Sequence, residues 1–109
     1  MPILTLVSIT CMNTDETDKD EIFLKVDEKK IWPLKQKFYP IDIDEDVSIQ
    51  LKLNVSVGLC NIELWEFDFI GSNELLGSFE FKTDKTGSYS EMMSNHKGDS
   101  SYILNYEIN

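Results

Sequence analysis

The chain has 109 residues, of which 41% are hydrophobic and 11% aromatic, so it can bury one core and is not a disordered tail. Ten lysines and no arginine stand against twenty acidic residues, and the formal net charge is −10. A surface of this charge repels the phosphates of nucleic acids, which we therefore exclude as partners. We expect a single domain over residues 1–109.

No apolar run approaches the roughly 20 residues that a membrane-spanning helix needs. The apolar start, residues 1–7, lacks the basic flank and the small-residue cleavage site of a signal peptide. We interpret it as a first strand and expect a cytoplasmic or peripheral membrane protein. Cys11 and Cys60 lack metal-ligand spacing, and we predict two buried free thiols, with a disulfide as the alternative.

The first half of the chain alternates apolar and polar residues at the period of a β-strand. Residues 3–12 predict a long first strand, which leads through an acidic loop (13–21) into a second strand (22–26). A tight turn at residues 27–30 should return the chain as a short strand. Pro33 limits that strand, because proline cannot donate to a ladder.

The second half continues with strands and shows no convincing helical period. Residues 38–46 are expected to be an acidic connection, and residues 83–100 a polar, turn-rich segment with room for a short strand near Tyr89. The predicted strands of this half cover residues 47–57, with six apolar side chains on a buried face, 60–68, 75–81 and 102–108. Seven or eight strands with short connections predict an antiparallel sandwich or barrel.

The predicted hairpin over residues 60–81 carries three carboxylates close together. Glu66 and Asp68 share one face of its first strand, because side chains alternate along a strand. The turn that follows supplies Glu74. Three carboxylates at one hairpin end repel each other unless a cation lies between them.

Two stretches of the chain resemble the C2 domain family. Residues 64–77, LWEFDFIGSNELLG, match the strand of alternating aromatic and acidic residues, the loop, and the following Asn-acid pair and glycine of that family. Residues 18–26, DKDEIFLKV, resemble its other signature, in which an acid precedes a strand. The resemblance implies an eight-stranded antiparallel β-sandwich whose loops at one end bind calcium and dock on phospholipid membranes.

The resemblance also implies a set of calcium ligands. Calcium takes about six to eight oxygens and favours carboxylates and carbonyls. The matching acids are Asp20, Glu66, Asp68 and Glu74, and either Asp15 or Asp18 stands for the remaining loop acid. The alternative is an acidic, solvated loop end that supports solubility.

Several positions depart from the family pattern. Glu66 and Glu74 stand where the family usually has aspartate, and the extra methylene changes the reach of each carboxylate. Glu21 replaces a frequent proline, and Ile22 and Phe23 replace a Tyr-Val pair. These departures predict a divergent C2-like module.

Two further groups of residues bear on partners. Phe69 and Ile70 lie at the expected loop apex and are candidates for membrane contact. Five lysines fall within thirteen residues: Lys25, Lys29, Lys30, Lys35 and Lys37. On the C2 resemblance this basic patch contacts phosphoinositide headgroups or an acidic partner, and the alternative is that it decorates a hairpin and a blunted edge strand.

Other chemistry finds little support in the sequence. The acidic residues 42–46 resemble the start of an EF-hand calcium loop. The loop needs glycine where this chain has Val47 and glutamate where it has Leu53, so we reject this interpretation. His96, the single histidine, has no nucleophile and orienting partner in a recognisable pattern, and we expect no enzyme.

We predict a C2-like module that binds calcium and docks on a membrane or a protein. The alternative is a calcium-independent interaction domain or a component of a larger assembly, and the oligomeric state stays open.

Overall fold

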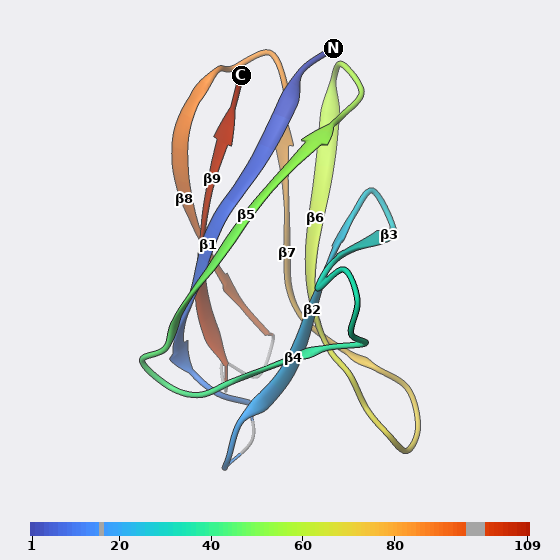
Figure 1. The fold of residues 1–109 in the computed structure, drawn as a ribbon, viewed down its shortest axis with the longest axis vertical. Helices are drawn as coiled ribbons and strands as arrows, with labels where there is room; N and C mark the ends of the chain where they lie inside the picture. Colours follow the sequence, from blue (N-terminus) through green and yellow to red (C-terminus); the bar gives the residue numbers. More distant parts are fainter. Residues whose placement is uncertain (16, 96–99) are drawn as a thin grey trace.

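The computed structural model describes residues 1–15, 17–95 and 100–109, and these residues form nine strands and no helix (Figure 1). The strands are β1 (Ile3–Asn13), β2 (Asp20–Val26), β3 (Lys29–Trp32), β4 (Tyr39–Ile41), β5 (Asp46–Asn54), β6 (Leu59–Glu66), β7 (Glu74–Lys82), β8 (Gly87–Ser94) and β9 (Ser101–Ile108).

The strands form two antiparallel sheets that pack as a sandwich. One sheet has the order β5-β1-β9-β8, and the other has the order β3-β2-β6-β7, with β4 also paired to β2. The two termini lie together at one end of the sandwich, opposite the loops that follow β1 and β6 (Figure 1). The predicted antiparallel sandwich is confirmed, with nine strands in place of eight.

The core follows from the period-two alternation of the central strands. Every second residue of β9 is buried, and so are Cys60, Ile62 and Leu64 of β6. In β1 the register shifts between Leu6 and Ser8, which turns both Leu6 and Ile9 inward. Cys11 and Cys60 are free and buried, as the sequence predicted.

One strand was missed in the sequence, and another is longer than predicted. β8 spans eight residues where only a short strand near Tyr89 was expected, and β4 lies within the predicted connection over residues 38–46. β8 is an edge strand with mostly exposed side chains, so it shows no clear apolar alternation. β4 is only three residues long and includes Pro40, which weakened its strand signal.

The predicted buried face of residues 47–57 is only partly correct. Val47, Ile49, Leu51 and Leu53 point towards the core but are half-exposed, because β5 is an edge strand. β5 ends at Asn54, and Val57 beyond it is 79% exposed. The position of a strand at the edge of a sheet limits the burial of its side chains, and the alternation of apolar and polar residues in the sequence does not reveal that position.

One edge of β2 is shared by two short strands. β3 pairs with the second half of β2 after a two-residue turn at Asp27 and Glu28, whose φ values of 49° and 70° suit a type I′ hairpin. β4 pairs with the first half, from Asp20 to Ile22. Residues 33–38, between β3 and β4, therefore loop out of the sheet.

Candidate functional site

The acidic loops after β1 and β6 meet because the first loop leads into β2, which is the neighbour of β6 in its sheet. β2 begins where the first loop ends, and it pairs with β6 so that Ile22 lies opposite Glu66. β6 pairs in turn with β7, which places Glu66 opposite Glu74. The ladder itself therefore brings these two carboxylates together at one end of the sandwich.

Three carboxylates form a compact cluster at this end. Asp15, Glu66 and Glu74 each offer one oxygen, and the three oxygens lie within 4.8 Å of one another. Glu66 is only 5% exposed. With Phe67, Asp68 and Ser72, these residues line an acidic hollow of about 240 Å³.

Asp20 lies behind this hollow and shapes its wall. Its side chain is fully buried, and both its oxygens accept hydrogen bonds from the backbone N–H of Asp15, at 3.1 and 2.9 Å. The hydroxyl of Tyr102 donates to Oδ2 of Asp20 at 2.5 Å, and Asn95 Nδ2 donates to Oδ1 of Asp15 at 2.9 Å. This network fixes the backbone N–H and the carboxylate direction of Asp15.

Four of the six predicted metal-site residues thus line one hollow, namely Asp15, Glu66, Asp68 and Glu74. Asp18 is exposed and lies outside the lining, and Asp20 is buried behind it. Between Asp15 and Asp18, which the sequence left open, the geometry favours Asp15.

Tyr102, Asn95 and Ser72 belong to this end of the molecule but were not singled out from the sequence. Burial, and then the hydrogen bond to Asp20, raises the pKa of the Tyr102 hydroxyl well above its usual range. In the sequence Tyr102 looks like one more core residue of an alternating strand. Only the packing of the two sheets against each other brings Tyr102 of β9 to Asp20 of β2.

The loop between β6 and β7 carries exposed apolar side chains. Phe69 is 71% exposed and Ile70 is 87% exposed. The Phe69 ring still packs edge-on against Phe67 and Phe38, with centroid distances of 5.1 and 5.5 Å. Asp68 shapes the apex, because its Oδ1 accepts the N–H of Ile70 at 3.0 Å.

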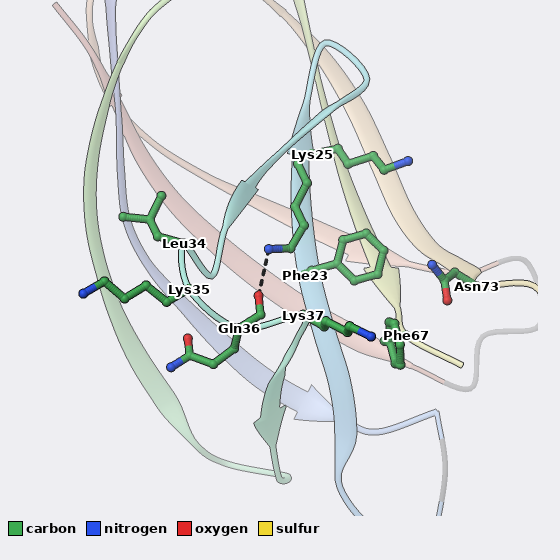
Figure 2. A pocket seen from close by; sticks show the side chains of 9 residues that line it. Phe23, Lys25, Leu34, Lys35, Gln36, Lys37, Phe67 and Asn73 are labelled. Carbon is green, nitrogen blue, oxygen red and sulfur yellow. Dashed lines mark hydrogen bonds between the residues drawn. The ribbon is translucent and has the colours of Figure 1, made fainter. Parts of the chain in front are cut away.

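A second, basic hollow of about 450 Å³ lies on the side of β2 that carries Phe23 and Lys25, away from the core residue Leu24 (Figure 2). Four of the five predicted patch lysines line it, and Lys29 lies elsewhere, beside Ile31 and Leu53. The remaining lining was not predicted: Phe23, Leu34, Gln36, Phe67 and Asn73.

The second acidic cluster, residues 42–46, uses its side chains within its own turn and on β1. Glu45 accepts the N–H of Asp42 at 2.6 Å, and Asp46 accepts the hydroxyl of Thr10 at 3.0 Å. These contacts agree with a structural turn. His96 lies outside the described residues.

Comparison with known proteins bears on the fold alone. No protein-family model and no curated protein matches the chain. Among solved structures, a C2 domain of plant Extended Synaptotagmin 1 matches with a TM-score of 0.62 and 12% identity, over 98% of this chain and 90% of that one. A structure described as a C2 domain matches with a TM-score of 0.53 and 13% identity, over 99% and 96% of the two chains. The chain has a C2-like fold.

The acidic end of this C2-like fold suits a hard divalent cation. Oxygens bound to one calcium ion at about 2.3–2.6 Å can lie up to about 5 Å apart, and the three clustered oxygens lie within 4.8 Å. Calcium also accepts irregular coordination with waters and carbonyls, which tolerates glutamate where aspartate is usual. Within the described residues, no helix is long and apolar enough to cross a membrane.

Proposed function

We propose that this chain is a binding module, not an enzyme, and that it takes one calcium ion in the acidic hollow. Asp15, Glu66 and Glu74 are its carboxylate ligands, and Asp68 lies at the rim. The observation that carries the proposal is the convergence of three carboxylate oxygens to within 4.8 Å, one from the loop after β1, one from the end of β6 and one from the start of β7.

Electrostatics supports a cation in this place. Glu66 is almost fully buried, and a buried carboxylate beside two others is costly unless positive charge compensates it. A divalent ion supplies that compensation. Asp20, held by Tyr102, already fixes Asp15 through hydrogen bonds, so placing this ligand costs less entropy when the ion binds.

Calcium binding would also change what this end can approach. The chain carries a net charge of −10, which opposes contact with anionic headgroups. An ion at the acidic hollow removes two units of negative charge beside the exposed Phe69 and Ile70. We propose that these two side chains then enter a phospholipid interface, or an apolar site on a protein partner.

Isothermal titration of calcium into the chelator-treated protein tests the metal site. We expect one site per chain with a Kd on the order of 10⁻⁵–10⁻³ M, in the range of sensor and weaker calcium modules. The double variant Asp15→Asn with Glu74→Gln should lose the heat signal. A matched control, Glu80→Gln with Asp84→Asn, removes two exposed acids elsewhere and should keep it. Absence of both heat and thermal shift at millimolar calcium would sink the proposal.

Vesicle sedimentation tests docking. Vesicles of phosphatidylcholine with phosphatidylserine should pellet the protein in calcium and not in chelator. Phe69→Ser with Ile70→Ser should abolish pelleting and leave the calcium titration unchanged, because neither side chain lines the acidic hollow. If this variant pellets as much as the unchanged protein, Phe69 and Ile70 are not part of the docking surface.

A calcium-independent interaction domain is the second candidate. It is favoured by the position of Asp20, which is engaged by Asp15 and Tyr102 and does not line the hollow. Glu66→Gln with Asp68→Asn discriminates the two. Under the calcium proposal this change weakens both calcium binding and docking, whereas under the second candidate it stabilises the fold and spares partner binding.

A further inference from the structure

The outer edge of β5 offers backbone hydrogen-bonding groups to a further strand. β5 is the outermost strand of its sheet, and no strand in the described part of the chain pairs with its outer side (Figure 1). The N–H and C=O of Ile3 in β1 are both bonded to Asn109, at 2.9 Å each. Asn54 lies opposite Ile3 on the other side of β1, so its own N–H and C=O point outward. Because this direction alternates along an antiparallel ladder, the backbone groups of Lys52 point outward too.

The inward face of β5 is apolar and only half covered. Its four apolar side chains pack against the core and are each half-exposed: Val47, Ile49, Leu51 and Leu53. A hollow of about 270 Å³ lies beside them, with Leu53 on one side and Ile31 of β3 on the other. The sandwich is therefore open along this edge, and a strand added to β5 would cover the exposed parts of these side chains.

The other sheet edges carry features that discourage pairing. β3 and β4 have only four and three residues, and β4 contains Pro40. β7 and β8 lie against one another, so closely that a Cβ added to Gly77 would lie 2.6 Å from the Cβ of Met93. β5 has a bulge at Gln50, where φ is 51°. Residues 51–55 beyond this bulge keep a regular edge.

Charge limits which partner can reach this edge. Twenty of the 109 residues are acidic, yet residues 47–62 contain no acid, and Lys52 is their single charged side chain. Two copies of a chain with a net charge of −10 repel each other over most of their surfaces. The edge of β5 is a place where they can approach without opposing carboxylates.

We propose that two copies of this chain pair through β5, antiparallel and around a two-fold axis at Leu53. The outward backbone groups set the register, because Lys52 then exchanges hydrogen bonds with Asn54 of the second copy. Leu53 faces Leu53 of the second copy, and Leu51 faces Val55. The two four-stranded sheets become one continuous sheet, and the half-exposed apolar side chains of both copies cover each other.

A second copy fits this edge better than a strand of an unrelated protein, because the edge is self-complementary. The two-fold axis places apolar residues opposite apolar residues and places Lys52 opposite Asn54, so no lysine faces a lysine. The acidic turns that precede β5 point away from each other. Asp46 is seven residues from Leu53, so the two copies of Asp46 lie roughly 45 Å apart at about 3.3 Å per residue, far beyond the Debye length of about 8 Å.

The pairing does not depend on calcium. Glu66 and Glu74 belong to the strands of the other sheet, β6 and β7. The test is therefore carried out in chelator, where failure of the calcium proposal has no influence on the result. A ladder this short gives an interface at the small end of the known range, so the dimer should be weak and reversible.

Sedimentation velocity of the full chain at physiological salt tests the dimer. We expect the weight-average mass to rise from that of one chain towards that of two between about 10 µM and about 1 mM. Leu53→Glu should raise the dimer Kd at least about tenfold, because two glutamates would face each other at the axis. The matched control, Met92→Glu, adds the same charge at an exposed position on β8, the opposite edge of the same sheet. It should change the Kd less than about threefold, because it lies far from the axis.

Asn54→Pro separates loss of pairing from loss of folding. It removes an N–H that points outward and does not bond to β1, and proline is tolerated at such edge positions. The thermal midpoint of the monomer should therefore stay within about 3 °C of that of the unchanged chain, a shift that corresponds to a small change in stability. The dimer Kd should rise at least about tenfold, because two hydrogen bonds of the ladder are lost by symmetry.

Cysteine crosslinking tests the register. Leu53→Cys should give a disulfide-linked dimer in oxidised glutathione, because residues that face each other in a non-hydrogen-bonded pair have Cα atoms about 4.5 Å apart. Val57→Cys is the control, because Val57 is more exposed, at 79%, but does not face its own copy in this register. The native thiols of Cys11 and Cys60 are buried and should stay silent.

Three results overturn the proposal. The first is a single monomeric species up to about 1 mM, which would leave the edge to a strand of another protein. The second is an equal loss of dimer in Leu53→Glu and Met92→Glu. The third is crosslinking of Val57→Cys as fast as that of Leu53→Cys.

Discussion

The acidic and basic hollows share Phe67 in their walls but are built in different ways. The acidic hollow rests on ladder register and on a buried network, in which Glu66 faces Glu74 and Asp20 is fixed by Tyr102. The basic hollow rests on a loop outside the sheet and on exposed lysines over aromatic rings. Changes in the network of Asp20 and Tyr102 behind the acidic hollow should therefore cost fold stability, whereas changes at the exposed lysines of the basic hollow should alter binding alone.

The largest effect is expected from Asp20→Ala. The change leaves the Tyr102 hydroxyl and the Asp15 N–H without the carboxylate that accepts their hydrogen bonds, and each buried donor left unsatisfied costs about 1–3 kcal/mol. We expect the free energy of unfolding in urea to fall by about 3–5 kcal/mol. Asp18→Ala, in the same loop but exposed, should change it by at most about 0.5 kcal/mol. Equal effects would contradict the buried-network description.

Calcium should stabilise the fold through the acidic hollow only. Free calcium at 100 times its Kd raises the free energy of unfolding by about 2.7 kcal/mol, if the unfolded chain does not bind it. Thermal or urea unfolding with and without calcium measures this. The increment should vanish in Asp15→Asn with Glu74→Gln and persist in Lys25→Glu with Lys37→Glu. Loss of the increment in the lysine variant would show that the two hollows are not independent.

Tyr102→Phe should cost less than Asp20→Ala. It removes one buried hydrogen bond to a carboxylate, worth about 1.5–3 kcal/mol, but leaves the Asp15 N–H bonded to Asp20. We expect unfolding measurements to show a loss in that range and calcium titration to show a modest drop in affinity. Tyr106→Phe is the matched control, because Tyr106 is buried in the same strand with no bond to Asp20 in the described network.

The smallest effect is expected at the two buried thiols, Cys11 and Cys60. Burial raises the pKa of Cys11, and burial followed by the charge of Asp27 raises that of Cys60 to about 12. Because the thiolate is the reactive form, neither should react with a disulfide reagent at pH 8 in the native protein. Reactivity falls with decreasing pH and rises only as pH approaches these raised values. The lysine variants should not change it, whereas Tyr102→Phe should expose Cys11, its neighbour across the ladder, before Cys60.

The sequence predicted those parts of the fold that depend on local alternation. The strands that hold Leu24, Ile62 and Leu104 were expected and are buried, and the turn at Asp27 and Glu28 was expected from its composition. The length of β8 was underestimated and β4 was missed, because an edge strand and a three-residue strand have little alternation to detect.

The candidate sites were predicted in part for the same reason. Glu66, Asp68 and Glu74 lie close in sequence, so their grouping follows from one hairpin. Asp20 lies outside the lining of the acidic hollow and is hydrogen-bonded to Tyr102, which is 82 residues away in the sequence. The aromatic lining of the basic hollow combines Phe23 of β2 with Phe67, which follows the end of β6. Contacts of this kind are set by the order of the strands and by the packing of the two sheets, neither of which alternation encodes.

The loop over residues 33–38 leaves the sheet between β3 and β4, and Lys30 ties it back by its side chain. An edge strand interrupted in this way gives the molecule a segment that can be redesigned without disturbing the ladder. Closing a longer loop costs only about 0.6 kcal/mol for each doubling of its length. A protein engineer can therefore graft new recognition sequences at this position and keep the sandwich as an unchanged scaffold.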